Sequence, residues 1–141
     1  MKNTATFQKA EKLQNLIKEL LAYNDVEPVY DFALRGTDNP NTLDNIMKTQ
    51  ERLQAEIDDL ARELNTLMGR QIKFPMADSY AYYIVTKVMK TQVQLTWVKY
   101  CDAWQDDRTG YQSNIGRGYV EKKVKGEDRM AELFGAKRVQ A

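Results

Sequence analysis

The stretch "SYAYYIVTKVMKTQVQLTWVKYC", residues 79–101, decides the fold class of this chain. It is rich in Tyr, Ile, Val, Thr and Trp, which favour β-strands. We expect antiparallel strands over 80–89 and 92–101 with a turn at Lys90-Thr91. The opposed residues are then Val88 and Val93, Thr86 and Leu95, Ile84 and Trp97, and Tyr82 and Lys99. This register gives a nearly continuous apolar face, so the stretch predicts a β-hairpin with Trp97 in the core.

The hairpin needs a cover, because two strands alone are marginally stable in water. Residues 117–124 are expected to form a third strand or a helical turn, and residues 127–135 a short closing helix, with Gly126 between them. Residues 108–118 contain three glycines and are interpreted as a mobile loop. The C-terminal half therefore predicts a small antiparallel module of about three to five strands, which resembles an SH3-like barrel in architecture.

Two amphipathic helices are expected before the sheet. Residues 6–23 carry apolar side chains at steps of three and four, which predicts the first helix. A second helix is expected from Asn39-Pro40 to Gly69, where the apolar positions follow a heptad pattern. These positions are Leu43, Ile46, Gln50, Leu53, Ile57, Leu60, Leu64 and Leu67, with Gln50 as a polar break. The pattern predicts a helical hairpin in which the first helix covers the second.

The unequal lengths of the two helices leave part of this seam without a cover. A helix of about 18 residues cannot span one of about 30 residues at 1.5 Å per residue. The remainder is expected to meet the β module or another copy of the chain. A homodimer would use the oligomer seam formed by Leu53, Ile57, Leu60 and Leu64, with Gln50 helping to fix its register.

The chain is thus expected to be an α+β protein of two parts. A helical hairpin or coiled coil occupies residues 1–72, and a small antiparallel β module with a short C-terminal helix occupies residues 73–141. Charge divides similarly: residues 1–70 carry 9 Lys or Arg and 12 Asp or Glu, whereas residues 71–141 carry 12 and 8. The second half is mildly basic, well short of a dedicated DNA-binding domain.

The composition excludes several chemical mechanisms. The chain has no histidine, which removes Ser-His and Cys-His nucleophile pairs and the usual zinc ligands. The one cysteine, Cys101, cannot form an internal disulfide, which favours a cytoplasmic setting. No run of 18 apolar residues is present, so no membrane span is expected. We therefore expect no catalytic residue, no bound metal and no cofactor.

A cluster of carboxylates follows the second predicted strand at Asp102, Asp106 and Asp107. Three carboxylates can hold Mg²⁺ or Ca²⁺. The segment lacks the alternation of an EF-hand loop, however, and Asp106-Asp107 followed by Arg108 and Gly110 is typical of a turn. The turn is the favoured interpretation, and a carboxylate-metal enzyme is the third functional hypothesis.

Aromatic and basic residues of the C-terminal half predict a recognition surface, because Trp, Tyr and Arg are enriched at binding hot spots. The candidate partner-binding residues are Trp104, Arg108, Tyr111, Tyr83, Tyr100, Arg117 and Lys99. The leading hypothesis is a non-catalytic protein that binds another protein as an accessory factor or inhibitor, for example a phage or mobile-element blocker of a host nuclease complex. The alternative is a nucleic-acid-binding regulator, which would stack bases on the aromatics and hold phosphates with the cations.

Overall fold

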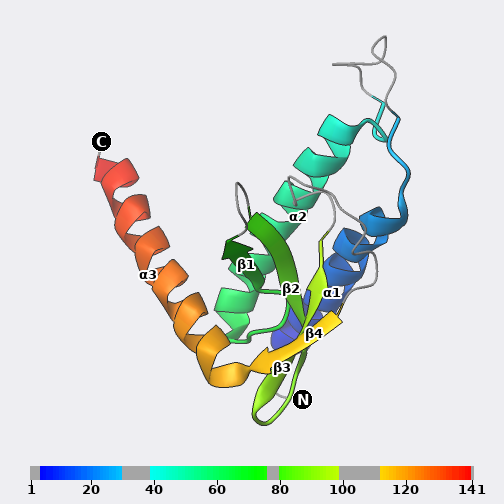
Figure 1. The fold of residues 1–141 in the computed structure, drawn as a ribbon. Coiled ribbons are helices and arrows are strands. Elements are labelled where there is room, and N and C mark those ends of the chain that lie inside the picture. Colours follow the sequence, from blue (N-terminus) through cyan, green and yellow to red (C-terminus); the bar gives the residue numbers. More distant parts are fainter. Residues whose placement is uncertain (1–3, 30–38, 76–79, 99–111, 141) are drawn as a thin grey trace.

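A computed structural model describes residues 4–29, 39–75, 80–98 and 112–140 of the chain. The described elements are, in order, α1 (Thr4–Ala22), the short 3-10 helix η1 (Tyr23–Asp25), α2 (Leu43–Leu64), β1 (Gln71–Pro75), β2 (Tyr80–Val88), β3 (Gln92–Trp97), β4 (Gln112–Gly116) and α3 (Arg117–Gln140). Figure 1 shows α1 and α2 beside a curled sheet, whereas α3 follows β4 directly, contacts the body through its first half and then projects from it. The expected α+β class is confirmed.

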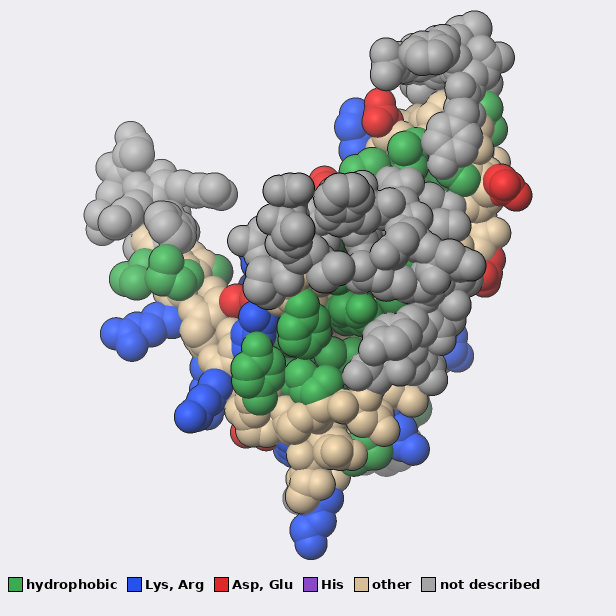
Figure 2. Space-filling model, in the orientation of Figure 1, with side chains coloured by type: hydrophobic (Ala, Val, Ile, Leu, Met, Phe, Trp, Pro, Cys, Tyr) green, Lys and Arg blue, Asp and Glu red, His purple; other side chains and the backbone are tan. Residues whose placement is uncertain are grey.

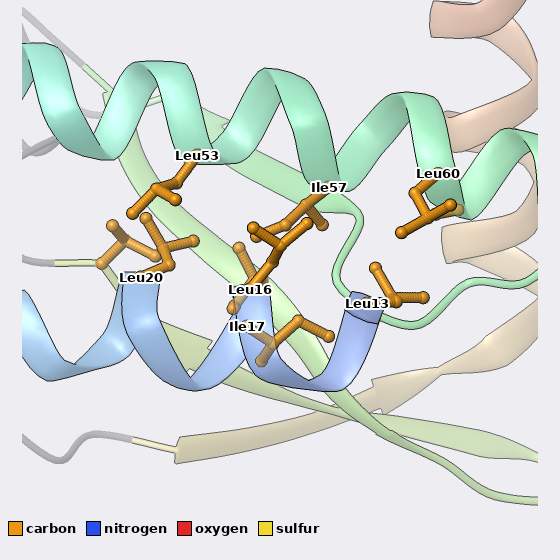
Figure 3. Packing of buried hydrophobic residues seen from close by; sticks show 10 residues of the cluster. Leu13, Leu16, Ile17, Leu20, Leu53, Ile57 and Leu60 are labelled. Atoms are coloured by element: carbon orange, nitrogen blue, oxygen red, sulfur yellow. The ribbon is translucent and has the colours of Figure 1, made fainter. Parts of the chain in front are cut away.

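The helices α1 and α2 pack antiparallel along their apolar stripes. In Figure 3, Leu13 lies opposite Leu60 at one end of the pair, and Leu20 lies opposite Leu53 at the other. The four residues considered for a dimer seam pack in this cluster within one chain: Leu53, Ile57 and Leu60 are buried, and Leu64 is partly buried. The first helix therefore covers the seam of the second, as the hairpin interpretation expects.

Gln50 interrupts the apolar seam and is fully buried. Its Nε2 atom donates a hydrogen bond to the carbonyl oxygen of Leu20, 3.2 Å away. Carbonyls in the last turn of a helix have few donors within the helix, and Leu20 lies in the last turn of α1. Gln50 therefore supplies a donor near that end, and this bond fixes the register of α2 against α1 inside one chain.

Helix α2 is shorter than its heptad pattern predicts. The side chain of Thr42 accepts a hydrogen bond from the backbone amide of Asn45 and caps the N-terminus, so the helix begins at Leu43. At the other end Asn65 has a left-handed φ of 53°, and its amide bonds to the carbonyls of Ala61 and Arg62. Asparagine adopts this conformation more easily than most residues. The helix consequently ends at Leu64, before the expected stop at Gly69.

The four strands form one antiparallel sheet in the order β1-β2-β3-β4. The pair β2 and β3 is the expected hairpin, whereas β1 was not anticipated. Strand β4 corrects the interpretation of residues 108–118 as a loop, because residues 112–116 pair with β3 along its full length. The sheet is curled into a half-barrel (Figure 1), and an SH3-like barrel is not confirmed.

The register of the hairpin is only partly as expected. Val88 pairs with Val93, but a bulge between Val85 and Lys87 then places Val85 opposite Leu95. The expected pairings of Thr86 with Leu95, and of Ile84 with Trp97, are therefore wrong. One extra residue in β2 shifts every later pair by one position and turns those side chains to the other face.

Both faces of β2 are consequently buried. Ile84 belongs to the cluster between the sheet and the helical pair, which also contains Val98. Val85 lies in a second cluster on the other face, together with Trp97 of β3 and Val120 of α3. The two parts of the fold are also joined by a buried hydrogen bond of 2.7 Å, which Asn24 Nδ2 donates to the carbonyl of Trp97.

The C-terminal segment is one continuous helix of 24 residues. The helical alternatives for residues 117–124 and 127–135 are thus confirmed, whereas the strand alternative and the break at Gly126 are wrong, and the helix is longer than expected. A glycine inside a helix costs about 1 kcal/mol relative to alanine, which weakens a helix without ending it. Arg117 Nε and Glu121 Oε1, one turn apart, form an ion pair of 2.8 Å that supports the first turn.

Candidate functional site

The middle of α3 is held to the rest of the protein by a buried arginine. Arg70, which directly precedes β1, donates from Nη1 to Oδ2 of Asp128 at 3.3 Å and from Nη2 to Oδ1 of the same carboxylate. Arg62 at the end of α2 donates from Nε to Oδ1 of Asp128 at 2.9 Å. Two guanidinium groups from different elements therefore converge on one carboxylate of α3, and such charge-assisted pairs are stronger than neutral hydrogen bonds.

A second carboxylate, that of Asp58, completes this network from α2. Its Oδ1 lies 3.6 Å from Nε of Arg70 and accepts a hydrogen bond of 3.1 Å from Gln54. Burial raises the pKa of Asp58 from 3.8 to about 6, and the positive charge of Arg70 offsets only part of this effect. Burial also raises the pKa of Asp128, but hydrogen bonds from Arg70 and Arg62 outweigh it, so that pKa lies below its ordinary value.

A cleft of about 440 Å³ opens beside this network, between the end of α2, the turn that follows it and the first half of α3. Its walls carry more cations than acids, and the charged lining residues are Arg62, Arg70, Arg117, Lys125, Glu121 and Asp128. The ion pairs described above account for both acids and for three of these four cations. We therefore interpret the cleft as part of the interface that fixes α3 to the body.

The opposite face of α3 points to solvent and carries apolar side chains. Tyr119, Met130 and Leu133 expose 53%, 51% and 53% of their surface. Figure 2 shows apolar side chains and long basic side chains along this helix, away from the body of the protein. Exposed apolar residues that gather on one element are typical of a contact surface for another molecule.

A basic side chain connects this face to the sheet. The Nζ atom of Lys123 lies 5.9 Å from the ring centroid of Tyr119 on α3 and 5.9 Å from that of Phe74 on β1. The ring of Phe74 in turn packs edge-on against Tyr83, with centroids 5.7 Å apart. The cation–π contacts place the charge of Lys123 beside the aromatic rings at the start of α3.

Most of the partner-binding residues expected from the sequence lie outside the described residues. These are Lys99, Tyr100, Trp104, Arg108 and Tyr111, and the carboxylates Asp102, Asp106 and Asp107 lie there as well. Tyr83 is described and is buried in the second cluster, with 8% of its surface exposed, so little of its ring is open to a partner. Arg117 is half-buried, paired with Glu121, and donates to the carbonyl of Met89 at 3.1 Å.

The parts of the chain that the structure describes contain neither a metal-binding cluster nor a membrane span. Within those parts, no group of three or more His, Cys, Asp or Glu side chains is placed to hold a metal ion. No described helix has both the length and the apolar character needed to cross a membrane. The strongest candidate among the described residues is therefore the outward face of α3, which the sequence interpretation missed because it divided this helix into two elements.

Comparisons of the chain with models of protein families, with curated proteins and with solved structures found no match.

Proposed function

We propose that this chain is a non-catalytic protein that acts by binding another protein, with the outward face of α3 as part of its recognition surface. The observation that supports this proposal is the half-exposure of Met130 and Leu133 on a helix that projects from the body. Covering these side chains would remove apolar surface from water, at about 25 cal/mol for each Å². No contact among the described residues covers the exposed half of Met130 or of Leu133, so both remain open to a partner.

The construction of the molecule suits an accessory factor or an inhibitor. Arg70 and Arg62 hold the middle of α3 against the body, so the projecting part of the helix is kept in one orientation and loses little freedom on binding. A rigid projecting helix can block a surface of a larger complex or join two of its components. A phage or mobile-element blocker of a host nuclease complex is one such role.

The segment 99–111 provides a second candidate surface. We propose that Trp104, Arg108 and Tyr111 contact the same partner, because aromatic and arginine side chains dominate binding energy at protein interfaces. Their replacement by alanine, together in one variant, should abolish binding while the far-ultraviolet circular dichroism stays unchanged. Binding that persists would restrict the recognition surface to the helices.

Site-specific photocrosslinking tests the proposal. A photoreactive amino acid is placed at Leu133 on the outward face of α3, and a matched variant carries it at Ala55, an exposed position on α2. In cells of the native host, the probe at position 133 should yield a discrete protein adduct that the probe at position 55 does not. If both positions give the same background, the outward face of α3 is not a protein-binding surface.

A nucleic-acid-binding regulator is the second candidate, and one observation favours it. Lys122, Lys125 and Arg129 are exposed on α3 and could contact phosphates. Such binding should weaken steeply as salt rises, because each neutralised phosphate releases counterions. A gel shift with generic single- and double-stranded DNA and RNA at low salt decides the question, since no shift under these conditions removes this candidate.

A further inference from the structure

We infer that the outward face of α3, with its exposed apolar residues beside the cations Lys122, Lys125 and Arg129, binds an acidic amphipathic helix of the partner protein. This inference rests on the proposed function and adds the chemistry of the partner segment. It follows from three features of α3: which of its charges are already paired, where its apolar side chains lie around the helix, and how open the surface is between them.

Two of the four acidic side chains of α3 are paired inside the molecule, and of the other two Glu127 is half-buried and Glu132 is exposed. Glu121 pairs with Arg117, and Asp128 pairs with Arg62 and Arg70. The cations Lys122, Lys125 and Arg129 are all exposed, and they form no ion pair with another described residue. Three exposed cations stand against the one exposed acid, Glu132, so the described surface that α3 offers to a partner has an excess of positive charge, although the whole chain carries a formal net charge of only +1.

The apolar residues and these cations lie side by side on α3. An α-helix turns by about 100° for each residue, so Tyr119, Met130 and Leu133 fall within about 60° of one another. On the same projection Lys122, Arg129 and Lys125 form an adjacent row, and the buried residues Val120 and Val124 lie on the opposite side. An apolar stripe flanked by a row of like charge matches an amphipathic helix of opposite charge.

Gly126 lies in the middle of the stripe and leaves room for a partner backbone. A Cβ atom added at this position would meet no other atom within 4 Å. Gly126 has no left-handed backbone angle, since Gly69 is the described glycine with positive φ. Neither the backbone angle nor the packing of the fold requires glycine at position 126. The missing side chain would allow a partner helix to approach α3 closely at this point.

The same features disfavour a second copy of this chain as the occupant. Two α3 helices packed antiparallel on each other would bring their rows of cations to the same side, where like charges are unfavourable, and in a parallel pair neither row would face an opposite charge. Among the described residues of α1 and α2, Phe7 is the one large apolar side chain that is exposed, so the helical pair offers no matching stripe. A nucleic acid would use the cations but would leave Met130 and Leu133 uncovered.

The test uses synthetic helices of defined chemistry, each of about 20 residues to match the length of α3. One peptide carries a leucine stripe flanked by glutamates, a second carries the same stripe flanked by lysines, and a third carries the glutamates with the leucines scrambled. Binding of the fluorescently labelled peptides to the full-length protein is measured by anisotropy. Vesicles of phosphatidylserine in phosphatidylcholine, and a single-stranded DNA, serve as competing classes of ligand.

The acidic peptide with the intact stripe should bind at least about tenfold more tightly than either other peptide. The variant K122E/K125E/R129E should reverse this preference and favour the lysine peptide. The matched variant K12E/K18E/K48E, which changes three exposed lysines of α1 and α2, should leave it unchanged. The substitution Gly126→Gln should weaken binding of the acidic peptide about tenfold without lowering the thermal midpoint, because the new side chain fills the open surface.

Three results would overturn the inference. The acidic and basic peptides could bind equally or not at all, the charge-reversed variant could keep the original preference, or the vesicles or DNA could bind better than the acidic peptide. The photocrosslinking experiment separates this failure from failure of the proposed function. A protein captured at position 133 through a contact segment that is not acidic would leave the proposed function standing and remove the acidic helix.

Discussion

Arg70 and Asp128 are 58 positions apart in the sequence, yet both carboxylate oxygens of Asp128 accept hydrogen bonds from the guanidinium of Arg70. Arg70 is buried at the start of the sheet, whereas Asp128 lies on the third turn of α3. The pair therefore connects the core to the helix that carries the proposed recognition surface. Val124 and Val120 form the apolar part of the same contact, one and two turns before Asp128.

The substitution Asp128→Asn tests how far this pair holds α3 in place. It removes the charge that Arg70 and Arg62 share and leaves the buried guanidinium of Arg70 with Asp58 as its remaining ion-pair partner among the described residues. Breaking a buried ion pair in this way costs about 3 kcal/mol. Urea unfolding followed by circular dichroism should show this loss, and amide hydrogen exchange should show faster exchange in α3.

The control for this variant is Glu56→Gln, which breaks the exposed pair of Glu56 with Arg52 on α2. Exposed pairs one turn apart on a helix contribute about 0.5 kcal/mol or less. Equal losses of stability in the two variants would contradict the view that Arg70 and Asp128 form the anchor of α3.

Asp58 should make the protein less stable as the pH rises through the weakly acidic range. Its pKa is about 6 in the folded protein and 3.8 as the ordinary value, so the folded state holds this proton more tightly. The resulting stability is fully present below about pH 3.8 and is lost as the pH rises through about 6. The free energy of unfolding, measured by urea titration at a series of pH values, should fall across this window.

The variant Asp58→Asn isolates this contribution from those of other acids. Because asparagine resembles the neutral carboxyl, the decline between about pH 4 and 6 should be reduced, and the variant should be at least as stable as the parent at pH 7. Asp128 has a lowered pKa, so its own contribution is lost only at lower pH, as the pH falls through that pKa. An unchanged decline in the variant would assign the effect to another group.

Gly126→Ala should stabilise α3, because alanine has a higher helix propensity and the added methyl group meets no other atom. The free energy of unfolding should rise by about 1 kcal/mol, because residue 126 is helical only in the folded protein. Thermal unfolding by circular dichroism measures it as a higher midpoint. A lower midpoint would show that the fold does require glycine at this position.

The sequence predicted those elements of the fold whose apolar pattern has one period and one buried face. The helices α1 and α2 are of this kind. The turn at Lys90-Thr91 was also predicted, because it separates two runs of strand-forming residues. The register of β2 could not be predicted, because Tyr83, Ile84 and Val85 are consecutive and all three are buried on one face or the other. An alternating pattern is informative only when one face of a strand is polar.

The sequence indicates strand β4, and the ion pair of Arg70 with Asp128 that anchors α3, even more weakly than it indicates the register of β2. Ile115 is the one large apolar residue among the five residues of β4, and this strand forms because β3 offers unpaired backbone groups to it. Ion pairs between distant residues, such as Arg70 and Asp128, leave no periodic trace in the sequence. The outward stripe of α3 is periodic, but it becomes visible only when residues 117–140 are treated as one helix, and Gly126 argued against this.

Gly69→Ala should destabilise the protein about as much as Asp128→Asn, although it adds only one methyl group. Gly69 has a φ of +80°, and an added Cβ atom would lie 2.5 Å from Cγ2 of Ile57 and 3.0 Å from Cδ1 of Ile17. The left-handed backbone and the forced repacking together cost about 3 kcal/mol. Val85 fixes the backbone here, because its carbonyl accepts a 2.8 Å hydrogen bond from the amide of Gly69, so the chain cannot move away cheaply.

Urea unfolding of Gly69→Ala beside Gly126→Ala gives a matched comparison, since both variants add one methyl group to a glycine. The first should lose stability and the second should gain it, because only Gly69 combines a positive φ with packing against both helices of the pair. Trp97 is buried at the sheet, so its fluorescence reports unfolding of the core in both variants. A loss of less than about 1 kcal/mol in Gly69→Ala would mean that Ile57 and Ile17 repack freely, and that the junction between the helical pair and the sheet is looser than the close contacts imply.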